Sequence, residues 1–344
     1  MIEFIIRRLL WAVLLLFAIT LVCFALFFMV PSEPGTTVGF GATRDSVNLR
    51  ESLEIDGPLY KQYELFLVRI GHGSFGESWA NERDVKSVLS EALPVTISLV
   101  VGGAVLWLLI AIPIGILSAL RPRSLLDRLA TIFVLIGLAA HPVWLGLVLS
   151  YTLGYKAHIF PVGGGYCDLA NTGYYCSGFL QWFWHLMLPW FTFAMLYAAL
   201  YARMIRASVI ETMDEDYVRT ARAKGASGGQ VLRSHVLRNA MLPVVTMLGM
   251  DVGYWMANVL FIETVFSLPG VGRLLTQSLA RRDLPVLMAI TVLVALLIVV
   301  LNLVVDVVYG MLDPRVRFGT KRGRRKAQQF RAGSTPVSSA EQPA

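Results

Sequence analysis

The sequence predicts an all-α membrane protein with six transmembrane helices. Of its 344 residues, 56% are hydrophobic and only 15% are charged, which is more apolar surface than a soluble domain can bury. In addition, six stretches reach the length of about 20 mostly apolar residues that a helix needs to cross a bilayer. These stretches are Leu9–Val30, Leu93–Leu120, Leu129–Tyr155, Phe179–Ala202, Ala240–Phe266 and Leu284–Val305.

The first stretch predicts a permanent membrane anchor within residues 1–30. Its apolar run of 22 residues is longer than the roughly 7–15 residues of a cleaved signal peptide. No A-x-A cleavage pattern follows it. We therefore expect this segment to remain as the first helix.

Residues 31–92 predict an extracytoplasmic loop that contains one short helix. The helix is expected to start at Gly57-Pro58, because proline is favoured in the first helical turn. The glycines from Gly71 to Gly76 then predict a turn. The apolar stripe of this helix consists of Leu59, Tyr63, Phe66, Leu67 and Ile70.

The orientation of the chain follows from its Lys and Arg residues, which concentrate on the cytoplasmic side of a membrane. If the N-terminus is cytoplasmic, 20 of the 30 basic residues fall on that side. Both termini are therefore expected in the cytoplasm. The net charge of +7 does not call for nucleic acid, because the run KRGRRK at 321–326 lies where anionic lipid headgroups attract it. Residues 311–344 predict a basic, disordered tail.

The three cysteines fall into two groups. Cys23 lies in the first span, where it is expected to pack against its neighbours. Cys167 and Cys176 share the loop between the third and fourth spans, on the extracytoplasmic side in this topology. A disulfide is permitted there, and two free thiols are the alternative.

A charged loop, residues 206–240, interrupts the five-helix membrane core of residues 93–310. Ser208 and Glu211 fit a capping box at a helix start. Gly225 suits the left-handed position that ends a helix. The residues expected on one face of this short helix are Ile210, Met213, Tyr217 and Ala221.

The charges of this short helix favour a protein partner. Its acidic residues precede its basic ones, which complements the helix dipole and allows a Glu215–Arg219 pair. The alternative is a helix that lies on the lipid surface, but anionic headgroups would repel its four acidic residues. A groove on a soluble protein fits such a mixed surface better. We therefore expect a docking site.

The chain itself is not expected to bind ATP. Ser227-Gly228-Gly229-Gln230 is similar to the signature motif of cassette ATPases. However, the sequence contains no G-x-x-x-x-G-K-[ST] loop, whose backbone, Lys and hydroxyl are needed to hold a nucleotide's phosphates and magnesium.

Two polar residues in the fifth span predict a role in passage across the membrane. Asp251 lies near mid-bilayer, and Asn258 follows two turns later on the same helical face. We expect both to face a water-filled path, in which Asp251 would attract a cationic group. The alternative is a hydrogen bond to a neighbouring helix that fixes packing only.

Two other classes of protein are less well supported. An intramembrane acid also occurs in ion-coupled secondary transporters, which would work without an ATPase. A membrane hydrolase is disfavoured because G-x-S-x-G and H-E-x-x-H are missing. His141 has no nucleophile beside it and is expected to pack at the kink made by Pro142.

The chain resembles the dipeptide, oligopeptide and nickel branch of ATP-binding-cassette importer permeases, whose fold is the type I importer bundle. The matching segments are IIRRLL, DGPLYKQY, GSFGES, LPVTISL, DYVRTARAKG, LRNAMLPVVT, ETVFSLPGVGRLL, RRDLPVLMAI and DVVYGMLDPRVR. The superfamily's coupling motif opens with Glu-Ala-Ala, and this chain has Arg219-Thr220-Ala221 there. The resemblance assigns the coupling role to Thr220 and Lys224 as well as Gly225, and to Leu242-Pro243, which open the next span.

The resemblance also implies the partners and the cargo. It implies a second, homologous permease subunit, two cytoplasmic ATPases and an extracytoplasmic solute-binding protein, assembled in the bacterial inner membrane. Substrate would pass between the two permeases. Di- and oligopeptides are the expected cargo, with nickel, opines or glycosides as the alternatives, and the resemblance implies no cofactor, no metal and no enzymatic activity in this chain.

Overall fold

The computed structural model describes residues 2–29, 59–161 and 178–312, and this part of the chain is helical apart from turns and a single bridge between Glu77 and Asp84. The prediction of an all-α protein is confirmed. The proposed disulfide partners Cys167 and Cys176 and the tail from residue 313 lie outside the described residues.

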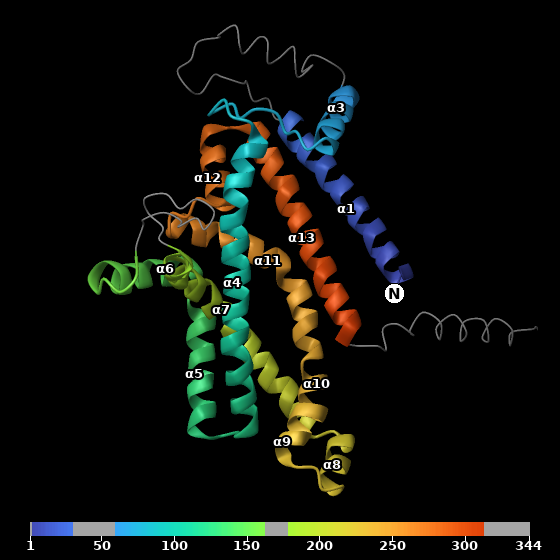
Figure 1. Cartoon of the computed structure of the whole chain (residues 1–344), viewed down its shortest axis with the longest axis vertical. Coiled ribbons are helices and arrows are strands. Elements are labelled where there is room, and N and C mark those ends of the chain that lie inside the picture. The colour runs from blue at the N-terminus through green and yellow to red at the C-terminus, as the bar shows by residue number, and fades with distance from the viewer. Residues whose placement is uncertain (1, 30–58, 162–177, 313–344) are drawn as a thin grey trace, which may run out of the picture.

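The helices pack together as a bundle (Figure 1). In chain order they are α1 (Ile2–Met29), α3 (Leu59–Gly71), α4 (Val85–Leu120), α5 (Leu125–Ala139), α6 (Pro142–Leu149), η1 (Ser150–Lys156), α7 (Phe179–Met213), α8 (Asp216–Ala223), α9 (Gly228–Val231), η2 (Leu232–Val236), α10 (Leu237–Ala240), α11 (Leu242–Val265), α12 (Val271–Arg281) and α13 (Leu284–Leu312).

Among the described residues, five helical segments are long and apolar enough to cross a membrane, and there are six if the bent pair around residue 140 counts as one span. The third predicted span is not straight, because the chain bends by 104° between α5 and the α6–η1 segment. Proline lacks an amide proton and disfavours helical geometry in the preceding residue. His141 is accordingly extended, and its imidazole accepts a hydrogen bond from the Val143 amide at 3.3 Å. His141 therefore caps α6, and its side chain is exposed.

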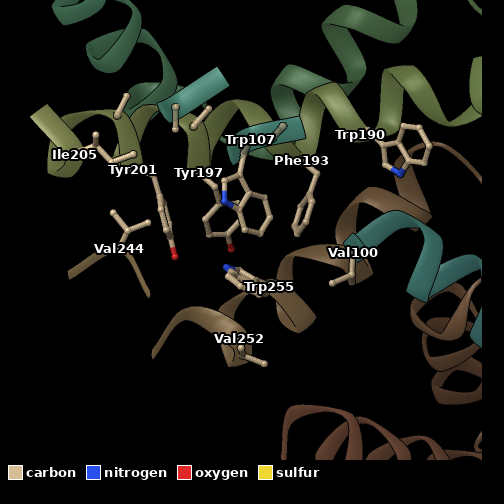
Figure 2. Close-up of a cluster of buried hydrophobic side chains, with 14 of the residues drawn as sticks. Val100, Trp107, Trp190, Phe193, Tyr197, Tyr201, Ile205, Val244, Val252 and Trp255 are labelled. Atoms are coloured by element: carbon tan, nitrogen blue, oxygen red, sulfur yellow. The ribbon is translucent and has the colours of Figure 1, made fainter. Parts of the chain in front are cut away.

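The core of the bundle is the long contact between α4 and α7, where glycines let the two helices approach closely. A Cβ atom added to Gly102 would lie 2.1 Å from the Trp190 ring, and one added to Gly103 would lie 2.3 Å from Phe193. About one turn further along α4, the centroid of the buried Trp107 ring lies 4.9 Å from that of Tyr197 in α7 and 4.8 Å from that of Trp255 in α11 (Figure 2). Aromatic rings thus join α4, α7 and α11.

Helix α3 confirms the helix predicted after Gly57-Pro58, and it packs on α1. The Tyr63 ring lies 5.2 Å from Phe24, and its hydroxyl lies 3.1 Å from the Thr20 hydroxyl. Helix α1 in turn lies beside α13 (Figure 1), to which the 2.7 Å ion pair between Arg8 and Asp306 connects it. Gly73 and Gly76 both have positive φ, so the predicted glycine turn is also confirmed.

Candidate functional site

The charged loop forms a compact helical unit at one end of the bundle, beyond the ends of α4, α5 and α7 (Figure 1). The predicted capping box at Ser208 and Glu211 is wrong, because α7 continues without a break to Met213. The Ser208 hydroxyl instead donates to the Ala240 carbonyl at 3.0 Å. The hydroxyl thus donates to a carbonyl distant in sequence, whereas a capping serine would accept from a backbone amide of the next turn.

Helix α8 is therefore shorter than expected and starts at Asp216. Ile210 and Met213 belong to α7, so they do not share a helix with Tyr217 and Ala221. The predicted Glu215–Arg219 pair is replaced by an ion pair between Arg219 and Asp216 at 3.7 Å.

The two faces of α8 differ in what they contact. Val218 is fully buried, and Ala221 packs against the main hydrophobic core, so this face holds α8 on the bundle. The opposite surface is exposed and carries three of the residues predicted to couple, namely Tyr217, Thr220 and Lys224. We call these three residues the coupling face.

Gly225 ends α8 as predicted, with a left-handed φ of +86°. The Gly225 amide donates to the Arg222 carbonyl at 3.0 Å, and the Ala226 amide donates to the Ala221 carbonyl at 3.2 Å. This pair of bonds is the Schellman motif, in which glycine avoids the steric penalty of the left-handed conformation. The motif turns the chain from α8 towards α9.

Several contacts then fix the loop to the bundle. The Asn239 amide group donates to the Tyr217 hydroxyl at 2.7 Å, which joins α8 to α10. Ser227, in the segment similar to the ATPase signature, caps α9 by accepting from the Gln230 amide at 3.4 Å. Helix α11 begins at Leu242 with Pro243 in its first turn, as predicted. The loop therefore forms one packed unit with α7 and α11.

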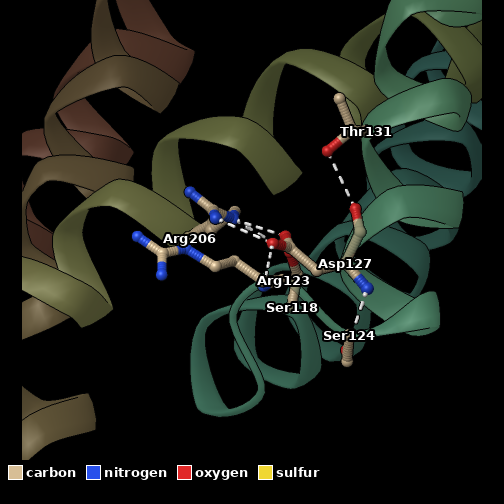
Figure 3. A network of polar contacts seen from close by, with 6 residues as sticks. All are labelled: Ser118, Arg123, Ser124, Asp127, Thr131 and Arg206. Atoms are coloured by element: carbon tan, nitrogen blue, oxygen red, sulfur yellow. Dashed lines mark hydrogen bonds and ion pairs between the residues drawn. The ribbon is translucent and has the colours of Figure 1, made fainter.

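An ion pair that the sequence analysis did not identify lies next to this unit (Figure 3). Arg206 of α7 donates two hydrogen bonds to Asp127 of α5, at 2.8 and 3.0 Å. Asp127 is buried and also accepts from the Ser118 hydroxyl of α4 and the Arg123 amide at 2.9 Å. This cluster, which we call the Arg206 clamp, joins three helices near the coupling end. Opposite charges near the ends of neighbouring spans are the sequence signal that points to such a pair.

Asp251 and Asn258 both face α7, where each meets a tyrosine. The Tyr201 hydroxyl donates to Asp251 at 3.0 Å, and the Asn258 amide group donates to the Tyr197 hydroxyl at 2.9 Å. Figure 2 shows both hydroxyls pointing from α7 towards α11. The geometry therefore contains the interhelical hydrogen bond that the packing alternative specified. Asp251 remains only half-buried.

Among the described residues, no cluster of His, Cys, Asp and Glu has the arrangement of a metal site. The candidate site thus has two parts. One is the packed charged loop at one end of the bundle, and the other is the pair of hydrogen bonds from Asp251 and Asn258 of α11 to tyrosines of α7. Such an arrangement can transmit a force between an attached protein and the membrane helices.

Comparison with known proteins identifies the chain's relatives. Residues 111–318 match the family described as binding-protein-dependent transport system inner membrane component, and residues 1–100 match the N-terminal part of such a membrane component. The chain is 36% identical over 321 residues to the oligopeptide transport system permease protein AppB of Bacillus subtilis, which covers 92% of this chain and 100% of that protein. It is 34% identical over 337 residues to the dipeptide transport system permease protein DppB of Escherichia coli K12, with 92% and 99% covered. The di/tripeptide permease DppB of Pseudomonas aeruginosa UCBPP-PA14 is 34% identical over 334 residues, with 92% and 99% covered.

Proposed function

Because this chain belongs to the family of binding-protein-dependent transport system inner membrane components, we propose that it forms half of the membrane path of an ATP-driven importer for di- and oligopeptides. A permease of this family works with ATPase and solute-binding partners. The observation that carries the assignment is the coupling face of α8, which lies exposed on a loop packed against α7 and α11. The names of its relatives AppB and DppB support peptides as cargo.

The mechanism follows from the attachment of the loop. When the partner ATPases close on ATP, a groove on one of them carries α8 with it. Because α8 is held by buried Val218 and by the Tyr217–Asn239 bond, its displacement moves the ends of α7 and α11. A packed bundle responds by shifting between discrete arrangements. The bundle thus alternates between inward- and outward-facing states, and the ATPase partner supplies the free energy.

The second permease completes the path. We infer that it is a homologous chain and that the peptide passes between the two permeases. This inference rests on the family relationship and on the half-exposed Asp251, which sits on α11 beside an exposed surface that includes Met250 and Tyr254.

Reconstitution tests the proposed function directly. The chain, a homologous permease, the ATPases and the solute-binding protein are assembled in liposomes, and uptake of labelled dialanine is measured with and without ATP. Uptake that requires both ATP and the binding protein is the expected result. If dialanine is not taken up but a nickel salt, an opine or a glycoside is, the cargo is reassigned within the same class of importer. Uptake driven by an ion gradient without ATP would overturn the mechanism.

The proposed orientation places both termini and the coupling face in the cytoplasm. Cys167 and Cys176, after reduction, should then react in intact cells with a membrane-impermeant maleimide. A cysteine introduced at exposed Gly229 should react only after the cells are opened. Buried Cys23 should stay unlabelled in both cases and serves as the internal control. The reverse labelling pattern would contradict the orientation and the docking of ATPases on α8.

Asp251 is proposed to attract the ammonium group of the peptide or a cationic side chain. Asp251→Asn keeps the shape and a hydrogen-bonding partner for Tyr201 but removes the charge. We expect uptake of Lys-containing dipeptides to fall more than that of Glu-containing ones, by about fivefold if about 1 kcal/mol of attraction is lost. Asn258→Leu, which removes a neutral contact with Tyr197, is the matched control and should not discriminate by charge. Equal uptake of both peptides by Asp251→Asn would leave only a packing role.

A further inference from the structure

An exposed stripe of side chains runs along α11 beside the two hydrogen bonds to α7. Its residues recur at spacings of three and four, which places them on one face of a helix. Asp251 and Asn258 lie on the flank of this face that meets α7, so a polar pair borders the stripe along one side. The exposed residues, which we call the α11 stripe, are Met250, Tyr254, Ala257 and Phe261.

His141 lies at the end of the α11 stripe that is farther from Asp251. Its imidazole meets the Phe261 ring edge to face, with the ring centroids 6.5 Å apart. Helix α6, which His141 caps, packs closely on the end of α11, since a Cβ atom added to Gly146 would lie 3.1 Å from the Val265 side chain. The imidazole therefore has a fixed place beside α11, and it is nevertheless exposed.

The cap on α6 also decides which hydrogen bond His141 can offer. Its Nδ1 accepts from the Val143 amide at 3.3 Å, so this nitrogen carries a lone pair and not a proton. In a neutral imidazole the proton is then on Nε2. The exposed edge of His141 thus presents an N–H donor to a group outside the chain.

The depth of these polar groups indicates that the α11 stripe faces water and not lipid. Figure 1 shows α6 leaving the bundle about midway between the two ends of α4. Asp251 is the tenth residue of the 24-residue helix α11. A carboxylate or an imidazole is costly in hydrocarbon, and such groups face the interior of a bundle or an aqueous cavity. The surface between them therefore belongs to the aqueous path.

The distance between the two polar groups fits a peptide of more than two residues. Phe261 follows Asp251 by ten residues, which is about 15 Å along a helix axis. An extended chain spans about 3.3–3.6 Å per residue, so about four or five residues cover this distance and two do not. Between the polar groups, the exposed rings of Tyr254 and Phe261 offer apolar contacts to peptide side chains.

We propose that a peptide of about four residues lies along the α11 stripe during passage, with its ammonium group at Asp251 and its carboxylate accepting from the Nε2–H of His141. This inference rests on the proposed function, which supplies the aqueous path and the role of Asp251. His141 adds recognition of the second terminus and, through its distance from Asp251, a preference for length. The hydrogen bond favours a free carboxylate over an amide, because an ionised acceptor bonds more strongly than a neutral one.

The test compares His141→Asp with the unaltered chain in liposomes that hold the complete transporter, with a binding protein that binds peptides of both lengths used below. Aspartate keeps an acceptor for the Val143 amide but places a negative charge where the donor was. Uptake is measured for tetraalanine, for its C-terminal amide, and for dialanine and its amide. We expect the ratio of free to amidated tetrapeptide uptake to fall by about tenfold. The dipeptide ratio should change much less. Preferences of the binding protein cancel, because it is the same in every sample.

Two further variants serve as controls for the change of charge. His158→Asp makes the same substitution at an exposed residue beyond the far end of the α6–η1 segment, where the left-handed φ of +52° is tolerated by aspartate. It should keep the tetrapeptide ratio of the unaltered chain. His141→Ser also keeps a cap on α6 but adds no charge, so the ratio should fall less and in the same direction. This variant tests the proposal if His141→Asp does not assemble.

Labelling of single cysteines tests whether the α11 stripe is wet. The three native cysteines are replaced by serine, and Phe261→Cys or Leu14→Cys is introduced into the assembled transporter. Phe261→Cys should react with a water-soluble thiosulfonate, and tetraalanine should slow the reaction. Leu14→Cys, on the exposed surface of α1, should stay unlabelled. A Phe261→Cys variant that is unreactive both with and without ATP would place the stripe in lipid and overturn the proposal.

The remaining outcomes separate this contact from the proposed function. If the unaltered chain imports peptides with ATP and the binding protein, and His141→Asp keeps the tetrapeptide ratio, His141 does not hold the carboxylate. An equal loss of the ratio for both lengths would overturn the spacing between His141 and Asp251. Uptake of dialanine but not of tetraalanine by the unaltered chain would do the same. Absence of any ATP-driven peptide uptake by the unaltered chain would instead contradict the proposed function.

Discussion

Gly225→Val is expected to abolish most ATP-driven uptake while leaving the protein inserted in the membrane. Gly225 has a φ of +86°, and no atom lies within 4 Å of the position where a Cβ atom would be added. The penalty is therefore one of backbone conformation, and a β-branched residue is the least able to adopt it. Such strain costs about 1–3 kcal/mol, which lowers the population of the Schellman turn by about 5- to 150-fold. The coupling face would then lose its fixed position.

The matched controls use the same loop. Gly225→Asn should retain uptake close to that of the unaltered chain, because asparagine tolerates the left-handed conformation. Gly228→Ala should also be tolerated, since Gly228 has no positive φ and nothing within 4 Å of the added atom. Uptake is measured in vesicles, with ATP hydrolysis measured in parallel to show uncoupling. Full uptake by Gly225→Val would mean that the geometry of this turn is not needed for coupling.

Asp127→Ala is expected to destabilise the protein most among single changes near the coupling end. The change leaves the Arg206 guanidinium without its two-bond partner and the Ser118 hydroxyl without its acceptor. Breaking a buried ion pair costs about 3–5 kcal/mol. Because the Arg206 side chain is 36% exposed, water screens part of this charge, and we expect about 3 kcal/mol. The melting temperature of the purified transporter should fall by about 5 °C or more.

Two comparisons isolate the contribution of the clamp. Asp127→Leu/Arg206→Met should recover much of the lost stability, because no unpaired charge remains. Glu91→Ala, which breaks the exposed Arg83–Glu91 pair, should change stability by only about 0–1 kcal/mol. A variant Asp127→Ala as stable as the unaltered chain would show that the clamp does not hold α4, α5 and α7 together.

The sequence by itself determined the features that depend on local chemistry. Apolar runs located the membrane helices, because a bilayer accepts only segments whose backbone polar groups are bonded internally. The end of α8 at Gly225 was predictable, since glycine alone adopts the left-handed turn without strain. The helix at Leu59–Gly71 followed equally from the Gly57-Pro58 start, the glycines after it and a periodic apolar stripe.

The tertiary structure decided the features that depend on residues distant in sequence. Ser208 looked like a helix cap, but α7 continues through it, and its hydroxyl donates to the Ala240 carbonyl, 32 positions away. Proline signalled a kink near His141, yet the angle of 104° depends on how α6 packs against α7 and α11.

Pairings of polar side chains within the bundle were likewise settled only by the packed structure. Asp127 and Arg206 are 79 positions apart, and Asp251 and Tyr201 are 50 positions apart. Local patterns show that such residues are costly inside a membrane and therefore need partners. Which partner each residue meets depends on the helix packing, because it is the packing that brings these side chains within hydrogen-bonding distance.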